Sequence, residues 1–217
     1  MIPKIIHYCW FGKGEKPEQV IKYITLWKQK NPDYDIKEWN ESNFDYQQWK
    51  FCREAYQVKK FAFVSDVCRL YALLTEGGIY LDTDIEMIKN FDPFLSDKSF
   101  VGEERNHTIG SGCIGAEKGT SWVKDFLETY NTREFINYKG RLLDYPNTMY
   151  LTDFIRKYQQ KPKIYPIDFF YAKGYETKEV FITENTVCIH QYAASWFEKL
   201  TLKKKITNLI AKYKANN

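Results

Sequence analysis

The segment from Phe61 to Glu86, "FAFVSDVCRLYALLTEGGIYLDTDIE", constrains the fold of this chain most strongly. Its first part is apolar on almost every side of a helix, which predicts a buried helix rather than a surface one. Gly77 and Gly78 then end the helix, and the apolar run "IYL" predicts a buried strand. The segment therefore predicts an interior helix that is joined by a tight turn to an interior strand.

Two pairs of charged residues lie within or directly after the apolar runs of this segment. Asp66 and Arg69 are three residues apart, on one face of the helix, so they form either an internal salt bridge or the lining of a polar cavity. Asp82 and Asp84 follow the strand, where a period of two places both on one side and Thr83 on the other. Two such carboxylates can share Mg²⁺ or Mn²⁺, and ligands bind at this end of the strands in open α/β sheets.

The rest of the chain predicts an α/β fold. A strand at residues 5–8, a helix across "PEQVIKYITLWKQKNP" and a strand at "YDIKEW" open a βαβ unit. Further strands are predicted at "SFVGEE" and "GCIGAEKG", and helices at "SWVKDFLETYN" and "NTMYLTDFIRKY". Two late segments, "KIYPIDFFY" and "TVCIHQY", are predicted to be extended.

Composition narrows the class of protein. A length of 217 residues without a repeat or linker suits one domain, and the net charge of +4 is too small to indicate nucleic acid. Five cysteines without CxxC spacing favour a reducing, cytoplasmic setting over zinc or disulfides. The N-terminus is too short and polar for a signal sequence, and no apolar run approaches the roughly 18 residues of a membrane span. Aromatic residues, at 18%, favour a binding cleft.

Three metal-binding interpretations of the DxD motif compete. An EF-hand that starts at Asp82 fails, because it needs Gly at position 87 and Glu at position 93, where the chain has Met87 and Pro93. A phosphohydrolase could use Asp82 as its nucleophile, although such motifs usually follow the first strand of the domain. A metal could instead bridge the carboxylates to the diphosphate of a sugar nucleotide. A sugar- or nucleotide-binding module without catalysis also fits.

Three stretches, "IPKIIHYCWFG", the helix–GG–strand–DxD segment and "HQYAASW", together resemble glycosyltransferase family 32. This family includes yeast mannosyltransferases and bacterial capsular and lipopolysaccharide enzymes, and its core is similar to that of clostridial glucosylating toxins. The resemblance extends to about Trp196. It implies an α/β fold of the GT-A type, with a mixed, Rossmann-like sheet flanked by helices in one domain over residues 1–198. It also implies a sugar-nucleotide donor, a divalent metal such as Mn²⁺ or Mg²⁺, and retention of anomeric configuration.

The resemblance also implies roles for individual residues. Asp66 and Arg69 would hold the donor sugar's hydroxyls, with Ser65 beside them, and Asp84 would bind the metal directly. The base of the nucleotide would stack on Trp10, between contacts from Cys9 and Phe11. Tyr80 and Asp82 would lie near the ribose and the sugar, and Asp82 would also bind the metal. His190 would contact the metal or the diphosphate. Ser195 and Trp196 would close over the phosphates. Taken alone, Trp10 suits a core position, and His190 and His7 suit structural histidines.

The predicted reaction moves a hexose, galactose or glucose first, from a UDP-sugar to a surface-glycan acceptor in capsule, lipopolysaccharide or exopolysaccharide. UDP-N-acetylhexosamine and GDP-mannose are further candidates. No residue stands out as a covalent nucleophile, so the departing phosphate could take the acceptor's proton. Contacts with the acceptor are predicted near Asp144, Asn147 and Asp153, with the flexible stretch "GSGC" at 110–113 as a wall of the cleft.

The tail at 199–217 predicts a basic amphipathic helix. Leu202, Ile206, Leu209, Ile210 and Tyr213 share one helical face, and the part "LTLKKKITNLIAKYK" contains five lysines. Such a helix could lie on an anionic membrane surface at a lipid-linked acceptor. It could also pack on the domain or on a second copy in a homo-oligomer. The expected location is the cytoplasm, including the inner face of the plasma membrane.

Overall fold

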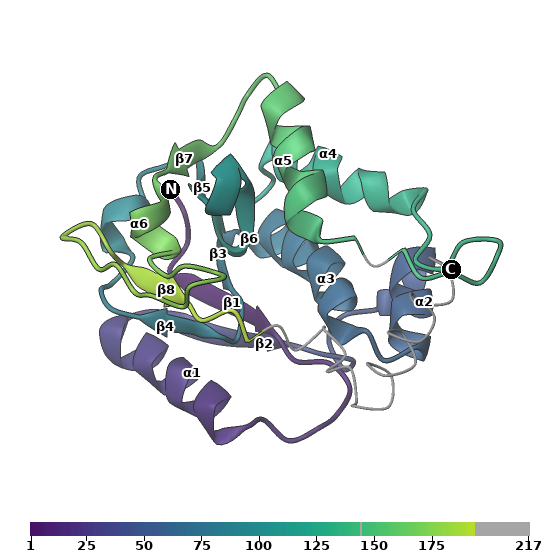
Figure 1. The fold of residues 1–217 in the computed structure, drawn as a ribbon, viewed down its shortest axis with the longest axis horizontal. Coiled ribbons are helices and arrows are strands. Elements are labelled where there is room, and N and C mark those ends of the chain that lie inside the picture. The colour runs from purple at the N-terminus through teal and green to yellow at the C-terminus, as the bar shows by residue number, and fades with distance from the viewer. Residues whose placement is uncertain (144, 194–217) are drawn as a thin grey trace, which may run out of the picture.

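The computed structural model describes residues 1–143 and 145–193, which form a layered α/β domain (Figure 1). Its centre is a six-stranded sheet with the order β2-β1-β3-β6-β5-β7. A second, two-stranded sheet pairs β4 with β8. The strands are β1 (Ile5–Cys9), β2 (Asp35–Trp39), β3 (Gly78–Leu81), β4 (Ile85–Met87), β5 (Ser99–Glu103), β6 (Ile109–Ala116), β7 (Lys163–Tyr165) and β8 (Cys188–His190).

The first three strands of the central sheet run in the same direction. β1 pairs in parallel with β2 on one side and with β3 on the other. β6 is antiparallel to both β3 and β5, and β7 is parallel to β5, so the sheet is mixed, as the sequence predicted. Because parallel strands end at the same edge, Trp10 after β1 and Asp82 after β3 follow neighbouring strand ends.

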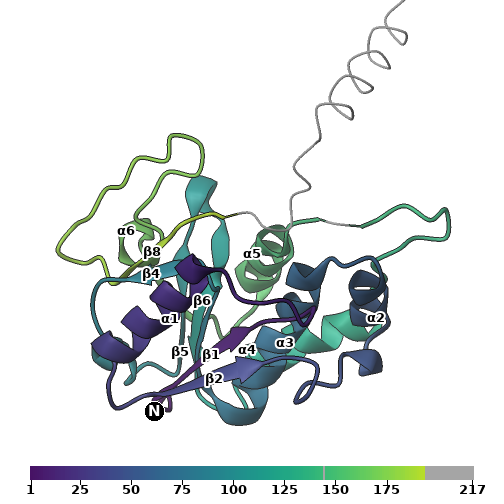
Figure 2. The same cartoon turned by 90° about the horizontal axis from the view of Figure 1, so that it is seen from below.

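Helices cover both faces of the sheet, as two perpendicular views show (Figures 1 and 2). α2, α3, α4 and α5 form one layer, and α1, α6 and the β4–β8 sheet form the other. Alternate residues of β3 divide between the two cores: Tyr80 packs on the α3 side, whereas Ile79 and Leu81 pack on the α1 side. The helices are α1 (Glu18–Lys30), α2 (Lys50–Gln57), α3 (Phe61–Glu76), α4 (Ser121–Glu128), α5 (Asn147–Lys157) and α6 (Ile167–Phe170).

The buried helix predicted from the sequence is α3, and its end is set by Gly77. Gly77 adopts a φ of +72°, a backbone conformation that residues with a Cβ rarely adopt, and its N–H donates to Leu73 O. Asp66 and Arg69 are buried with the apolar residues of the helix, at 7% and 4% exposure. The structure therefore places two charged groups inside the α3 core, where each requires a partner.

Three predictions for the other segments were incomplete or wrong. "KIYPIDFFY" is not one extended segment, because Pro166 ends β7 and its fixed φ of −55° starts α6. "TVCIHQY" does contain a late strand, Cys188–His190, as predicted, whereas α2 was not predicted. "GSGC" is not a flexible wall, because it lies within β6, where every residue is buried.

His7 is structural, as expected, because Trp39 Nε1 donates to its Nδ1 at 3.0 Å and its Nε2 lies 2.7 Å from Gly77 O. All five cysteines are buried and free. In the described ranges, no helix has the length and apolar character needed to cross a membrane. The predicted helix at 199–217 lies outside the described residues.

Candidate active site

The two aspartates of the DxD motif lie in the turn that joins β3 to β4. Ile85 N donates to Asp82 O at 3.0 Å and so closes the turn around Thr83. The sequence predicted that strand-like alternation would bring Asp82 and Asp84 to one side. The turn achieves the same convergence by reversing the chain instead.

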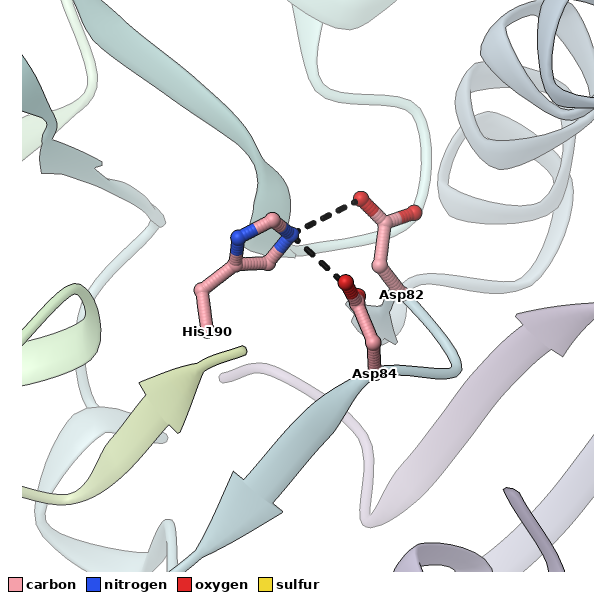
Figure 3. Close-up of side chains that lie close together, drawn as sticks. All are labelled: Asp82, Asp84 and His190. Carbon is pink, nitrogen blue, oxygen red and sulfur yellow. Dashed lines mark ion pairs between the residues drawn. The ribbon is translucent and has the colours of Figure 1, made fainter. Parts of the chain in front are cut away.

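His190 joins these aspartates from the far end of the described chain (Figure 3). The β4–β8 pairing aligns His190 with Ile85, the residue directly after Asp84. The His190 Nε2 atom lies 3.3 Å from Asp84 Oδ1 and 3.7 Å from Asp82 Oδ2. One ligand atom from each residue lies within 4.8 Å of the others, so the three could hold a single ion. We call Asp82, Asp84 and His190 the turn-borne group.

A glycine on β6 leaves room beside this group. A Cβ on Gly112 would lie 2.8 Å from Asp82 Oδ2, which is too close, and 3.1 Å from His190 Nε2, which is tighter than most Cβ contacts. The backbone N–H groups of Gly112 and Cys113 donate to Tyr171 Oη at 3.0 and 3.1 Å, which fixes this part of β6. The "GSGC" stretch is therefore the floor of the site.

Backbone groups after β8 hold Asp84 in place. Gln191 N donates to Asp84 O at 3.0 Å, and Ala193 N donates to Asp84 Oδ2 at 2.8 Å. One carboxylate oxygen of Asp84 thus faces the protein backbone, and Oδ1 faces His190. Two carboxylates and one imidazole form a set of oxygen and nitrogen ligands that fits a divalent cation.

Arg69 connects the buried helix to the turn-borne group. Its Nη2 lies 2.9 Å from Asp66 Oδ1 and 3.4 Å from Asp82 Oδ1, and its Nη1 donates to Ser111 O. The Tyr80 hydroxyl donates to Asp82 Oδ1 at 2.8 Å, and the Tyr80 ring packs 4.6 Å from the guanidinium carbon. Asp66 and Arg69 therefore form an internal salt bridge and also line the site, so both alternatives predicted from the sequence apply.

Burial and neighbouring charges shift the pKa values of Asp66, Asp82 and His190 by different amounts and in different directions. Burial raises the pKa of Asp66 to about 7, against the opposing charge of Arg69. Burial disfavours the ionised form of Asp82 as well, but Arg69, His190 and Tyr80 outweigh it and lower its pKa to about 2. Burial would lower the pKa of His190, yet the charges of Asp84, Asp82 and Glu104 raise it to about 9. Without a metal, His190 is consequently a cation at neutral pH.

The predicted nucleotide-binding residues lie at the end of β1. Trp10 is partly buried and donates from its backbone N to Trp39 O and from Nε1 to Gly14 O, whereas Cys9 and Phe11 are buried in the α3-side core. Ser65 O accepts from Arg69 Nε at 3.3 Å. Their contacts with a donor stay predictions. Ser195, Trp196 and Asp144 lie outside the described residues.

Several groups around the site were not predicted. Tyr171 and Gly112 form its floor, and Glu104 is a buried carboxylate whose charge acts on His190. Tyr130 contacts both Arg133 and Asn147, and the Asn147 side chain is buried, whereas Asp153 is exposed on α5. The alternating glycines of "GSGC" were the available signal for Gly112, because glycine inside a strand often marks a close approach.

Comparison with known proteins gives matches over the same region. Residues 17–101 match the family model described as a glycosyltransferase sugar-binding region containing a DXD motif. The subversion of eukaryotic traffic protein A from Legionella pneumophila is 29% identical over 159 residues, which covers 58% of this chain and 24% of that protein. An initiation-specific alpha-1,6-mannosyltransferase from Candida albicans is 30% identical over 141 residues, with 60% and 36% covered. The chain thus spans about a quarter to a third of these relatives.

A solved structure extends the similarity to most of the chain. The crystal structure of a glycosyltransferase involved in glycosylation of the major capsid of PBCV-1 superposes with a TM-score of 0.51. The match covers 88% of this chain and 95% of that one, at 13% identity. At this identity the match concerns the fold alone. The GT-A fold class predicted from the sequence is confirmed.

Proposed function

We propose that this chain, whose residues 17–101 match the DXD-containing glycosyltransferase family that its sequence resembles, transfers a hexose from a UDP-sugar to a surface-glycan acceptor. The transferred sugar is galactose or glucose, the metal is Mn²⁺ or Mg²⁺, and the anomeric configuration is retained. Glycosyl transfer itself and each of these specifics are parts of the proposal.

The observation that carries this proposal is the continuity between Asp66, Arg69 and Asp82. Arg69 contacts both carboxylates, and Asp82 in turn faces His190 in the turn-borne group. A donor whose diphosphate meets the turn-borne group would therefore present its sugar to the helix-borne pair, Asp66 and Arg69. Trp10 follows the neighbouring parallel strand, at the same edge of the sheet, where the base would stack.

The roles of the chain's own groups follow from these positions. Asp82, Asp84 and His190 would hold the divalent cation, which when bound neutralises negative charge that develops on the nucleoside diphosphate. Asp66 and Arg69 would orient the sugar so that the acceptor hydroxyl meets the anomeric carbon. With the acceptor on the same face as the leaving group, the departing phosphate takes the acceptor's proton. His190 gives up its own proton when it binds the cation.

The relatives bear on the choice of donor. The Candida albicans relative is named as a mannosyltransferase, which makes GDP-mannose the first competitor of the UDP-hexoses. The hydrolysis of phosphomonoesters through Asp82 is the second candidate, and it is weaker because Asp82 is engaged by Arg69 and Tyr80 on one oxygen and faces His190 with the other.

The decisive experiment is a panel of nucleotide sugars with Mn²⁺, in which free UDP or GDP is measured with and without acceptor glycans. We expect metal-dependent release from one donor, faster with an acceptor, and loss of release in Asp84→Asn or with a chelator. Donor cleavage that survives both changes would overturn the proposal. Release of inorganic phosphate from phosphomonoesters, with no response to Trp10→Ala, would favour the phosphohydrolase. Tight donor binding without turnover would indicate a binding module.

The location and the tail complete the proposal. We place the protein in the cytoplasm, because its five cysteines are free and buried. The basic segment 199–217 would contact anionic lipid at the inner face of the membrane, near a lipid-linked acceptor. Packing of the same segment on a second copy is the alternative. Deletion of 199–217 with vesicle sedimentation and light scattering distinguishes the two.

A further inference from the structure

We propose that Arg133, together with Asn147, binds a hydroxyl group of the transferred sugar and so determines which sugar the site accepts. The inference rests on the proposed function, because it assigns the sugar end of the same donor. Both residues act on Asp66, which Arg69 links to Asp82. Neither belongs to the DxD segment.

Unused hydrogen-bond donors mark this place. Within residues 1–143 and 145–193, buried side-chain atoms without a hydrogen-bond partner are Arg133 Nη1, Asn147 Nδ2 and His190 Nδ1. The His190 atom belongs to the turn-borne group. The other two are N–H donors, and Asn147 is 7% exposed. Buried donors are nearly always satisfied in folded proteins, so two together indicate acceptors that a ligand supplies.

Aromatic rings, rather than a carboxylate, hold the Arg133 guanidinium in position. Its central carbon lies 4.5 Å from the Tyr130 ring centroid and 4.4 Å from that of Tyr150. No ion pair to Arg133 occurs in the described part of the chain. Stacking leaves the edge of a guanidinium free to donate hydrogen bonds, which suits a binding residue better than a structural ion pair would.

The Tyr130 side chain brings Asn147 to the same place. The Tyr130 hydroxyl donates to Asn147 Oδ1 at 2.9 Å, which engages one end of the amide and leaves Nδ2 unused. The charge of Arg133 favours ionised Asp66 and opposes the rise in its pKa caused by burial; the Asn147 amide does the same through a contact with Asp66 that lies outside normal hydrogen-bond geometry. Both groups therefore lie close to the Asp66 carboxylate.

The chemistry of these three groups selects the ligand. A hydroxyl can donate to Asp66 while it accepts from Arg133 Nη1 or Asn147 Nδ2, so one sugar O–H satisfies groups of both kinds. A sugar carboxylate would accept from the donors but would be repelled by Asp66, and by Asp82 beyond Arg69. The structure therefore favours a neutral, hydroxylated hexose over a uronic acid.

The experiment compares sugars that differ by one hydroxyl. The full chain is assayed with Mn²⁺ for cleavage of UDP-glucose and its 3-, 4- and 6-deoxy analogues, or of the matching GDP-mannose set if that donor is cleaved. The variants are Arg133→Met, Arg133→Lys and Asn147→Ser, and the control is Arg141→Met, an exposed arginine on the same segment. Affinity for UDP or GDP alone is measured for each.

We expect the wild type to lose at least about tenfold in kcat/KM on one analogue, because a site built for a hydroxyl rejects its absence. Arg133→Met should lose a similar factor in kcat/KM on the parent sugar, because it removes the same contact. On that analogue its kcat/KM should be little lower than that of the wild type, and its nucleotide affinity should stay within about twofold of the wild type. Arg133→Lys should keep part of the discrimination, and Arg141→Met all of it.

Equal discrimination in the wild type and Arg133→Met would overturn this inference, as would a wild type that treats all the analogues alike. A parallel loss of nucleotide and sugar-nucleotide affinity would show a structural role instead, and would also overturn it. If Arg133→Met does not fold, Arg133→Lys and Asn147→Ser carry the same comparison. Absence of metal-dependent cleavage of any donor by the wild type would instead count against the proposed function.

Discussion

Asp84 and His190 come from a turn and from a strand of three residues, whereas Asp66 and Arg69 come from a buried helix of 16 residues. The helix-borne pair sets one carboxylate against one guanidinium, and Arg69 is tied to Ser65 O and Ser111 O as well as to Asp66. The turn-borne group sets two carboxylates against one imidazole and depends on the pairing of β4 with β8. Changes in the first should therefore affect folding most, and changes in the second should affect ligand binding most.

The largest effect is expected from Asp84→Asn, which removes a charged ligand from the turn-borne group. Metal chemistry at a charged leaving group contributes several kcal/mol, so we expect a loss of about a thousandfold in metal-dependent donor cleavage. Without metal, the variant should lose part of the stability that protonated His190 gains from the Asp84 charge, but the larger effect should be on cleavage. Cleavage rates and Mn²⁺ affinity measure the effect, with the exposed Asp33→Asn as the control. A variant with normal metal dependence would show that Asp84 is not a ligand.

Arg69→Met should affect folding more than any single change in the turn-borne group. It leaves Asp66 and Asp82 buried beside each other without their shared cation, which costs about 3–5 kcal/mol in comparable cases. Urea unfolding with a chelator measures the free energy, and Arg141→Met is the control. The double variant Asp66→Asn with Arg69→Met should recover part of the loss. Equal stabilities for wild type and Arg69→Met would contradict the comparison.

The turn-borne group should make stability depend on pH. The folded-state pKa of His190, about 9, lies above its ordinary 6.5, so its protonated form stabilises the fold fully below pH 6.5. This stabilisation, up to about 3 kcal/mol, is lost as the pH rises from 6.5 to 9. In chelator, the difference in unfolding free energy between wild type and His190→Gln should shrink across that window. A constant difference would place the titration elsewhere.

The smallest effect is expected from Gly112→Ala in the floor of the site. The added methyl group would press on Asp82 Oδ2 and His190 Nε2, so we expect weaker Mn²⁺ binding and a loss of about 1–2 kcal/mol in stability. Gly14→Ala is the control, because nothing lies within 4 Å of a Cβ there. Titration with Mn²⁺ and thermal melting provide the readout. Unchanged metal affinity would show that the floor can move aside.

Much of this arrangement could be predicted from local sequence. The α3 boundaries, the end of the helix at Gly77 and the strand before Asp82 follow from apolar periodicity and from glycine, which act over a few residues. The break at Pro166 was missed although proline limits strands, because the flanking aromatics suit a strand. Arg133 was missed because its neighbours Tyr130 and Tyr150 gain meaning only when the turn after α4 and the helix α5 come together.

The sequence by itself determined the opening βαβ unit, the buried helix α3, the strand before Asp82 and the residue types of the site, since these depend on periodicity and on contacts near in the chain. The tertiary structure decided that Asp82 and Asp84 converge through a turn and that Gly112 makes room for them. The tertiary structure also brought His190, which lies 106 positions after Asp84 in the sequence, to the two aspartates through the β4–β8 pairing. Such contacts depend on how the layers pack around the sheet, and no local pattern specifies that packing.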